Sequence, residues 1–439
     1  MKKQFRFAGV AIAAALALSV AACSSNPAGT TSPGTTAPGG RTEITVWAWE
    51  PTLKDVVLAF EAANPSIKVN LQNVGGAGDT YTKIDNAIAA GSGAPDIAQI
   101  EYYAIGQYAI PGKLADLTQF GADKLKDTFT TGTWNAVTLA GSGKVYGLPS
   151  DSGPMALFYN KATFDKAGVT EAPKTWDEYY AAAKKIRALG ANYYITTDNG
   201  DAGFATSMMW AAGAKPFGVK DQNVTIDLGD AGVVAFAEFW QKMIDEDLIN
   251  TKVGGWSDDW FKGLADGTIG SLITGAWMPA NLIGSAAGAS GNFRVAATPV
   301  ATAGTTANSE NGGSSMAVLE SSANKEAAYK FLEFNSSGAG VALRVKGGNF
   351  PSTTAELASA DFLGHTDDYF GGQKYNEVLA QAAKDVLPGW SYLPYQVYAN
   401  SIFGDKVSGA YSGRGTLKDA FKAWQDDLVK HGVEKGFIK

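Results

Sequence analysis

The sequence predicts an α/β fold divided into two lobes. An apolar strand at residues 43–49, an amphipathic helix at 53–62 and a second strand at 67–74 follow one another near the start of the folded part. Such a strand, helix, strand series normally forms a parallel pair of strands with the helix packed on it. About 400 residues remain after a low-complexity start, more than one hydrophobic core usually supports, so two lobes are expected.

The first residues have the layout of a secretory signal peptide, predicted at 1–22. Lys2, Lys3 and Arg6 precede an apolar run that is too short to favour a membrane-spanning helix, which needs roughly 20 apolar residues. Residues 20–23 (VAAC) resemble a bacterial lipobox, in which the cysteine is lipidated and becomes the first residue. We therefore expect Cys23 to be a palmitate-bearing anchor in the cell membrane, with an ordinary signal peptide and a chance cysteine as the alternative.

A linker is predicted at 23–41, directly after the signal peptide. Residues 24–40 are rich in Ser, Gly, Pro, Thr and Ala and contain no charge and no large apolar side chain. Such a segment cannot bury enough surface to fold, and as a flexible coil it would span on the order of 20 Å. We expect it to tether the folded part to the membrane.

Composition excludes several classes of function. After removal of the leader, 33 basic residues face 43 acidic ones, a net charge of −10, which makes nucleic acid an unfavourable partner. Cys23 is the only cysteine, so no disulfide can form within the chain, and the two histidines, His365 and His431, offer no zinc-type cluster. We expect no metal and no cofactor.

The rest of the chain continues the alternation of helices and strands. A helix at 80–90 and a strand at 96–100 extend the first lobe, whose sheet should be largely parallel. Further on, the patterns predict helices at 175–189, 231–245, 257–265, 325–335 and 416–432, and strands at 145–148, 155–159, 268–274, 293–300 and 314–319. The last two strands are expected to lead the chain back to the first lobe.

A polar break separates the strands at 145–148 and 155–159. Pro149 and Pro154 should stop continuous strand pairing there, and Asp151 lies in the gap. A chain that passes between lobes exposes its polar turn in the crevice between them, where ligands often bind.

Three motifs around this break resemble one family. Residues 146–154 (YGLPSDSGP), 157–161 (LFYNK) and 173–178 (PKTWDE) are similar to the bacterial extracellular sugar-binding proteins of ABC importers, the maltose-binding type, in lipoprotein form. Looser matches at 93–97, 275–277 and 312–315 extend the likeness over the chain after the leader.

The resemblance implies a two-lobed periplasmic-binding-protein-like fold of type II. Each lobe would be a mixed sheet flanked by helices, hinged with the ligand cleft between them. The implied first lobe comprises 42–151 and 297–346, and the second 152–296 and 347–439. The resemblance also implies a non-enzymatic, monomeric receptor that captures a sugar, a disaccharide or oligosaccharide, outside the cytoplasm and delivers it to the permease subunits of an ABC importer.

A sugar site needs groups that accept hydrogen bonds from hydroxyls, beside flat aromatic faces that cover C–H groups. Trp49 is the last residue of the predicted first strand, and Glu50 follows it at the turn. Trp47 and Trp49 share a face of the strand and could equally be core, with Glu50 then a solvated turn residue. Glu101 and Tyr102 end the strand at 96–100, where open parallel sheets place ligands.

Asp151 is the candidate on the polar break. Its side chain could instead cap an Asx-type turn, and the resemblance favours the ligand role. Trp277 ends the strand at 268–274 and matches the position at which the maltose-binding type places a sugar-stacking tryptophan. Gly313 would let backbone amides approach a ligand, or would simply serve a turn.

The other candidates are aromatic. Trp256 precedes Ser257, a helix N-cap, and should face the cleft. Trp210 lies in a segment that could be a helix buried on all sides, so a core position is the alternative. Trp390 and Tyr395 form an aromatic patch among prolines.

Two other classes of function stay open at this point. A secreted glycoside hydrolase would also combine carboxylates with aromatic rings, but it needs two carboxylates facing one bond at roughly 5 to 10 Å, and no catalytic motif stands out. A receptor for a non-sugar solute is the other alternative; anionic ligands are less attractive because no arginine lies in the proposed site stretches.

Overall fold

A computed structural model describes residues 36–37, 40–139, 142–220 and 223–439. The predicted signal peptide and Cys23 lie outside the described residues. The described parts all belong to one unit, Gly34–Lys439. Within those parts, no helix combines the length and the apolar character needed to cross a membrane.

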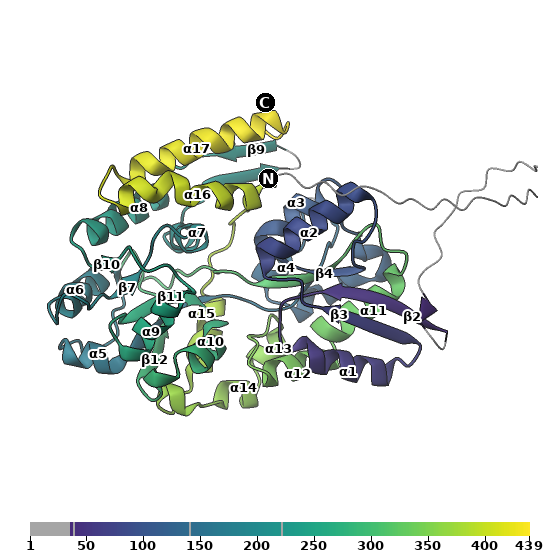
Figure 1. Ribbon diagram of the computed structural model, residues 1–439, viewed down its shortest axis with the longest axis horizontal. Coiled ribbons are helices and arrows are strands. Elements are labelled where there is room, and N and C mark those ends of the chain that lie inside the picture. Colours follow the sequence, from purple (N-terminus) through teal and green to yellow (C-terminus); the bar gives the residue numbers. More distant parts are fainter. Residues whose placement is uncertain (1–35, 38–39, 140–141, 221–222) are drawn as a thin grey trace, which may run out of the picture. The chain divides into compact units, whose positions relative to one another are not determined.

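The first sheet has six strands. They are β1 (Thr36–Ala37), β2 (Arg41–Trp47), β3 (Ile67–Gln72), β4 (Ile97–Glu101), β5 (Leu148–Pro149) and β13 (Ser314–Val318). The order is β1-β2-β4-β13-β5, with β3 also paired to β2. Figure 1 labels β2, β3 and β4 of this sheet. β2 runs parallel to β3 and β4, which confirms the strand, helix, strand unit, whereas β13 is antiparallel to β4 and β5. The predicted parallel arrangement therefore holds for β2, β3 and β4, and the sheet as a whole is mixed because β13 returns from far along the sequence and lies antiparallel between β4 and β5.

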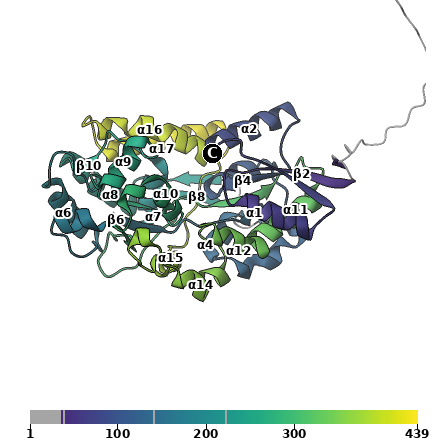
Figure 2. The same cartoon turned by 60° about the horizontal axis from the view of Figure 1, so that its bottom comes forward.

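Helices from an early and from a late part of the chain pack on the first sheet. α1 (Leu53–Ala63) buries Val56, Val57 and Phe60, as its amphipathic pattern predicts. α11 (Lys325–Ser336) and α12 (Ala339–Lys346) pack with α1 (Figure 2). The rings of Phe60 and Phe331 meet edge to face, with centroids 5.1 Å apart. The other helical segments of this part are α2 (Ala77–Ala90), η1 (Tyr102–Ala104), α3 (Ile105–Ala109), η2 (Leu117–Phe120), η3 (Ala122–Thr128) and α4 (Thr131–Ala136).

Two details differ from the sequence prediction at the edges of this sheet. Thr36 and Ala37, within the predicted linker, pair with Thr42 and Arg41 of β2. Backbone pairing needs no large side chain, so the lack of apolar residues does not prevent it. The strand predicted at 145–148 is the shorter β5, which covers only Leu148 and Pro149; Pro149 is its last residue, so strand pairing stops at this proline as predicted.

The second sheet consists of β11 (Ser271–Gly275), β6 (Met155–Asn160) and β12 (Phe293–Ala297), all antiparallel with β6 in the centre. β7 (Thr196–Thr197) pairs with β10 (Ile249–Asn250), and β8 (Phe217–Lys220) with β9 (Asn223–Ile226). The expectation that β12 leads back to the first lobe was wrong, because β12 pairs with β6 in the second sheet. Only β13 of that predicted pair crosses.

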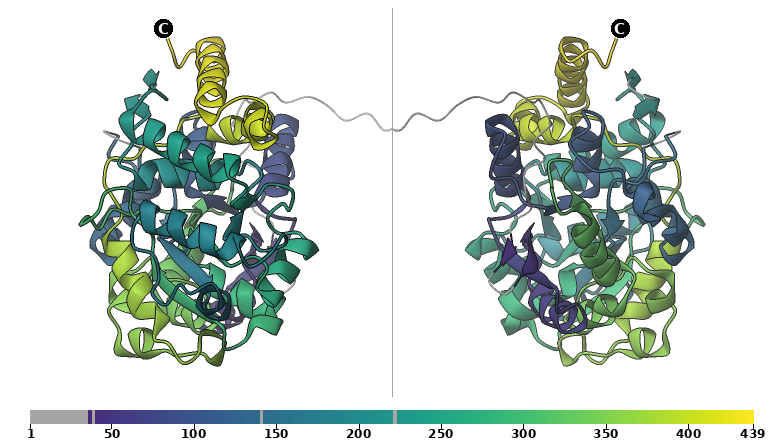
Figure 3. Two further views of the ribbon diagram at one scale, coloured as in Figure 1. Left: turned by 90° about the vertical axis from the view of Figure 1, so that its left-hand side faces the viewer. Right: turned by 90° about the vertical axis from the view of Figure 1, so that its right-hand side faces the viewer.

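Helices surround the second sheet, and α16 and α17 pack together (Figure 3). They are α5 (Lys161–Lys166), α6 (Trp176–Arg187), α7 (Ala202–Ala211), α8 (Ala231–Asp245), α9 (Asp258–Asp266), α10 (Met278–Ser285), η4 (Ala287–Ala289), α13 (Thr354–Leu357), α14 (Ala360–Gly364), η5 (Asp368–Phe370), α15 (Tyr375–Lys384), α16 (Gln396–Tyr411) and α17 (Leu417–Glu434). Thr175 and Thr416 cap α6 and α17 as their sequences predict, each accepting from the backbone N–H three residues later.

Three segments connect the elements of the two sheets: β5 to β6, β12 to β13, and α12 to α13. They lie side by side, since Asp151 forms a bridge with Pro351, and Pro154 forms one with Glu310. The second segment stays near the second sheet as far as Asn308, which forms a bridge with Val386. That crossing therefore lies further along the chain than the expected boundary at 296/297. We call the residues 149–154, 309–314 and 347–353 the crossing segments.

Candidate functional site

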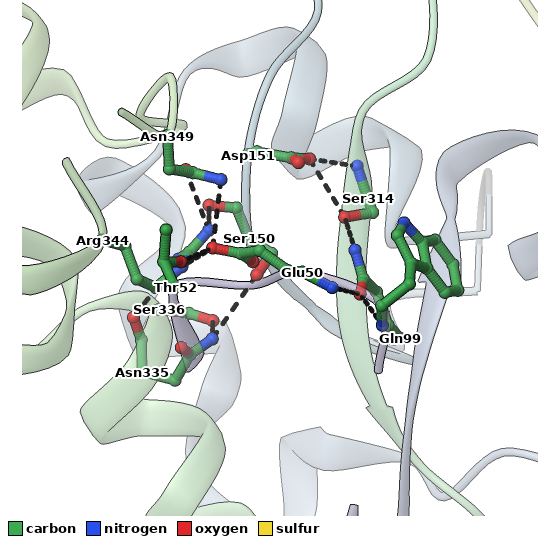
Figure 4. Close-up of polar contacts among 11 residues, drawn as sticks. Glu50, Thr52, Gln99, Ser150, Asp151, Ser314, Asn335, Ser336, Arg344 and Asn349 are labelled. Carbon is green, nitrogen blue, oxygen red and sulfur yellow. Dashed lines mark hydrogen bonds and ion pairs between the residues drawn. The ribbon is translucent and has the colours of Figure 1, made fainter. Parts of the chain in front are cut away.

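Asp151 is held on the first crossing segment by contacts to the second. Its Oδ1 accepts hydrogen bonds from the backbone N–H of Ser314 and from Ser314 Oγ, the latter at 3.1 Å (Figure 4). Its own backbone carbonyl accepts from the hydroxyl of Tyr102 at 2.5 Å. The carboxylate therefore contacts β13 and does not cap an Asx-type turn with the residues after it.

The environment of Asp151 raises the pKa of its carboxyl above the ordinary value. Burial raises its pKa to about 6, and the nearby negative charge of Glu50 acts in the same direction, while Arg344 and the two bonds from Ser314 oppose the shift. The side chain is nevertheless partly exposed. Near neutral pH it is largely ionised and can accept hydrogen bonds from a ligand.

Tyr102 and Gly313 meet behind this carboxylate. Gly313 has φ +94°, and a β-carbon at that position would lie 2.7 Å from Cε2 of Tyr102. The Tyr102 N–H also donates to the Gly313 carbonyl at 3.1 Å. Both the left-handed backbone and the ring contact require glycine. Tyr102 itself is buried, so it supports the crossing segment from behind.

Glu101 is the last residue of β4 and is partly exposed, as its place at the end of a strand predicts. Burial raises its pKa to about 7; a hydrogen bond from Tyr103 opposes this rise, and the charges of Asp151 and Asp201 add to it. Asp201 is the N-cap of α7, which belongs with the second sheet. Carboxylates from both lobes are thus near enough to influence one another.

Trp277 and Trp256 form a stack. Their ring centroids are 5.6 Å apart and their planes differ by 25°. Trp277 Nε1 donates to the carbonyl of Asn311 at 2.8 Å, which fixes this ring beside the second crossing segment. Trp256 is 53% exposed and has φ 69°, which is unusual for a residue other than glycine.

A second aromatic stack involves Trp210 and Trp390. The rings are nearly parallel, 7° apart, with centroids separated by 5.3 Å. Trp210 is buried, as the alternative prediction has it, and its Nε1 donates to the Leu387 carbonyl at 2.8 Å. Trp390 is partly exposed and meets Tyr392, whose ring lies 6.5 Å from that of Tyr103 beside Glu101.

Glu50 is buried, so the idea of a solvated turn residue was wrong. Its Oε1 accepts from Nε of Arg344 at 2.9 Å, in an ion pair that is nearly inaccessible to solvent. Trp49 is partly exposed and borders, with Glu50 and residues of α1 and β3, a hollow of about 720 Å³. That hollow lies beside α1, and the backbone N–H of Trp49 donates to Gln99 Oε1 at 3.0 Å, so Trp49 lies next to the buried Glu50.

Tyr395 is separated from the candidate site by its surroundings. It is 4% exposed, and its hydroxyl donates to the Leu428 carbonyl of α17 at 3.1 Å. Because the hydroxyl is already bonded, Tyr395 serves the core between α16 and α17.

Sequence reasoning missed Glu310 and Asn311. Glu310 is buried, accepts from Ser152 Oγ at 3.1 Å, and has its pKa raised to about 7 by burial and by the charge of Asp151. Asn311 Nδ2 donates to Ser207 Oγ of α7 at 3.1 Å, which links Trp277 to the helix that carries Trp210. The polar run 308–311 just before the glycine pair was the available signal.

The candidate site therefore follows the crossing segments, which carry Asp151, Glu310, Asn311 and Gly313 and hold the stack of Trp256 and Trp277 through the bond from Trp277 to Asn311. Its members are Glu101, Asp151, Trp210, Trp256, Trp277, Glu310, Asn311, Gly313, Trp390 and Tyr392. Among the described residues, no group of three or more His, Cys, Asp or Glu side chains is arranged to hold a metal ion. The arrangement offers flat faces and hydrogen-bond acceptors, which suits a neutral polyhydroxylated ligand.

Comparison with known proteins gives consistent results. Residues 47–342 match the family model described as bacterial extracellular solute-binding protein. A lactose-binding protein of Rhizobium radiobacter is 30% identical over 304 residues, 66% of this chain and 69% of that protein.

Two solved structures from bifidobacteria are similar over nearly their whole length. One is the ABC transporter associated binding protein from B. animalis subsp. lactis Bl-04 in complex with β-1,6-galactobiose, with 54% identity, a TM-score of 0.83, and coverage of 90% of this chain and 98% of that one. The other is the galacto-N-biose/lacto-N-biose I-binding protein of Bifidobacterium longum with lacto-N-biose, with 28% identity, a TM-score of 0.78, and coverage of 90% and 99%.

Proposed function

The chain belongs to the bacterial extracellular solute-binding protein family, and from this premise we propose that it binds a neutral disaccharide containing β-linked galactose and delivers it to an ABC importer. The sugar class is supported by the relatives: the protein with 54% identity holds β-1,6-galactobiose, and the one with 28% identity holds lacto-N-biose. Two lobes that close over the sugar would couple binding to a change in shape that a permease can detect.

The observation that carries the proposal is the Trp256 and Trp277 stack beside the crossing segments. Galactose has one face on which C–H groups gather, and this face packs well on an indole ring. Trp277 is fixed by its bond to Asn311, so the platform is ordered before the ligand arrives. Hydroxyls at the other edge of the sugar would then meet the acceptors Asp151 and Glu101.

The charges of the site support a neutral ligand. Glu101, Asp151 and Glu310 lie along it, and Arg344 is engaged by Glu50. An acidic sugar or a carboxylate solute would meet like charge, and the guanidinium of Arg344 is already paired. Among non-sugar solutes, anionic ones are therefore disfavoured.

We propose binding without hydrolysis. A glycoside hydrolase needs one carboxylic acid that donates a proton and a second carboxylate on the other side of the bond. Here Asp151 and Glu310 each use one oxygen to accept a bond from a serine, Ser314 and Ser152, which suits positioning better than proton transfer. Release of reducing sugar from galactobiose by the purified protein would contradict this part of the proposal.

Cys23 is proposed to carry the lipid anchor, and residues 24–35 with the start of β1 to lead from it to the folded body. We further propose a monomer that contacts permease subunits, with lobes of 42–151 plus residues from about 310 to 346, and 152 to about 309 plus 347–439. The position of Asn308 beside Val386 motivates the shifted boundary.

A thermal-shift screen of residues 24–439 tests the function. A ligand that binds only the folded state stabilises it by roughly 2.7 kcal/mol at one hundred times its Kd. We expect β-1,6-galactobiose, lacto-N-biose or lactose to raise the Tm, and galacturonic acid to leave it unchanged. A Tm that no neutral sugar moves, but that another class of solute raises, would refute the proposal.

A further inference from the structure

A buried polar network links Glu50, after the end of β2, to the crossing segments (Figure 4). Oε1 of Glu50 accepts from Arg344 Nε at 2.9 Å, from Asn349 Nδ2 at 3.2 Å and from the hydroxyl of Thr52. Its Oε2 is buried and has no hydrogen-bond partner among the described residues. Oε1 of Glu50 therefore accepts hydrogen bonds both from Thr52, its near neighbour in sequence, and from Arg344 and Asn349, which lie almost 300 residues later in the chain.

Arg344 extends this network to the first crossing segment. Its Nη2 donates to the carbonyl of Ser150 and to Asn349 Oδ1, the latter at 3.0 Å, and its Nη1 donates to the Asn335 carbonyl at 3.4 Å. The guanidinium is 1% exposed. The Ser150 carbonyl belongs to the peptide unit that carries the N–H of Asp151, so Arg344 restrains the backbone directly before that residue.

A second route reaches the Asp151 side chain. The backbone N–H of Glu50 donates to Gln99 Oε1 at 3.1 Å, and Gln99 Nε2 donates to Ser314 Oγ at 2.9 Å. Ser314 Oγ in turn donates to Asp151 Oδ1 at 3.1 Å. Gln99 and Ser314 are both buried, so water does not replace these bonds easily.

The two routes meet at one carboxylate. Arg344 donates a hydrogen bond to the carbonyl of Ser150, just before Asp151. The Asp151 carbonyl accepts from Tyr102, and Asp151 Oδ1 accepts from Ser314. Its Oδ2 makes no hydrogen bond within the described part of the chain, and the side chain is partly exposed. The free oxygen therefore has a defined direction before any ligand binds.

We propose that Glu50 and Arg344 are positioning residues for ligand binding: they orient Asp151 through Ser150 and through the Gln99 to Ser314 route, without contacting the sugar. The inference rests on the proposed function, in which Asp151 accepts from a sugar hydroxyl. A buried ion pair is often no more stabilising than a hydrophobic pair of the same size, so its presence here is better explained by orientation than by stability. Preorganised acceptors bind more tightly because the ligand need not order them.

A double-mutant cycle tests the proposal. Arg344→Lys keeps the charge but cannot donate to Glu50, Ser150, Asn335 and Asn349 together. We expect it to weaken galactobiose binding about tenfold in calorimetric titration. In the Asp151→Ala background, which has no side-chain oxygen to orient, the same change should weaken binding less than about twofold, measured at sugar concentrations high enough to saturate the weaker variant.

Control variants distinguish a loss of Asp151 orientation from a general loss of folding stability. Arg187→Lys alters an ion pair between α6 and Asp247, outside the network, and should leave the affinity unchanged. Free energies of unfolding are measured for every variant by denaturant titration. If Arg344→Lys does not fold cooperatively, Glu50→Gln, which retains the Oε1 acceptor, is put through the same cycle.

The outcomes distinguish the positioning role from sugar binding itself. Equal losses in both Asp151 backgrounds, or no loss from Arg344→Lys, would overturn the positioning role while leaving sugar binding intact. A wild-type protein that binds no sugar would overturn the proposed function and this inference with it.

Discussion

The indole of Trp256 stacks on that of Trp277 at a centroid distance of 5.6 Å, although Trp256 precedes α9 and Trp277 is the N-cap of α10. The outer ring is 53% exposed and the inner one is bonded to the second crossing segment. A sugar could pack on the edge of this pair, or displace the exposed ring and stack on the fixed one. Both arrangements depend on Trp277.

Trp277→Ala should weaken sugar binding at least about tenfold, because it removes the fixed aromatic face. Cooperative unfolding should persist, since the ring is only partly buried. Calorimetric titration and denaturant unfolding measure the two quantities. Tyr180→Ala, which removes an aromatic ring of α6 that contacts Lys242, is the matched control and should not change affinity. Equal affinities for Trp277→Ala and wild type would remove Trp277 from the site.

Trp256 allows a test of backbone strain. Its φ of 69° is tolerated by glycine but unfavourable for alanine. Trp256→Gly and Trp256→Ala both lose the ring, so both should weaken binding to a similar degree. Trp256→Gly should nevertheless be more stable than Trp256→Ala by about 1 kcal/mol. Equal stabilities of the two variants, measured by denaturant unfolding, would show that the loop relaxes to another conformation.

Gly313→Ala should destabilise the protein by about 2 to 5 kcal/mol, because a left-handed backbone and a ring contact add together. Its β-carbon would lie 2.7 Å from the Tyr102 ring. Gly304→Ala is the matched control, with φ +80° and no atom within 4 Å, and should be destabilising by only about 1 kcal/mol. Denaturant unfolding compares them, and similar values for both would argue against the contact with Tyr102.

Glu310 should make stability depend on pH. Its pKa is raised from 4.5 to about 7 in the folded state, so the folded protein binds more protons than the unfolded chain between these values. The free energy of unfolding should then fall as pH rises from about 4.5 to 7, by up to about 3 kcal/mol from this residue. Glu310→Gln should flatten the slope over this range, whereas Glu434→Gln, on the exposed surface of α17, should not. An unchanged slope in Glu310→Gln would contradict the assignment.

Cys23→Ser should release the protein from the membrane fraction, because a thioether-linked lipid requires the cysteine sulfur. Cell fractionation and metabolic labelling with palmitate measure this. The purified variant should bind sugar as the wild type does. Labelled Cys23→Ser protein would place the lipid elsewhere.

Local patterns predicted much of the fold. The spacing of Val56, Val57 and Phe60 indicated the buried face of α1, and Thr175 and Thr416 marked the starts of their helices. These features depend on residues a few positions apart, which a sequence displays directly. The position of Glu101 at the end of β4 was predicted by the same reasoning.

Long-range partners could not be predicted in this way. The burial of Glu50 depends on Arg344, 294 residues later, and nothing near Glu50 in the sequence indicates that partner. The sequence around Ser314 likewise does not indicate its partners: its Oγ accepts from Gln99 of β4 and donates to Asp151 on the first crossing segment. Glu310 and Asn311 resembled an ordinary polar loop until the fold placed Ser152 and Trp277 beside them. The residue types that suit a sugar were therefore visible in the sequence, whereas their partners depend on the fold.

Calorimetric titration of residues 24–439 with β-1,6-galactobiose is the decisive test of sugar binding. We expect a saturable signal with one sugar per chain that is lost or weakened at least about tenfold in Trp277→Ala. Heats no larger than those of dilution with this sugar, with lacto-N-biose and with lactose would contradict the proposed function.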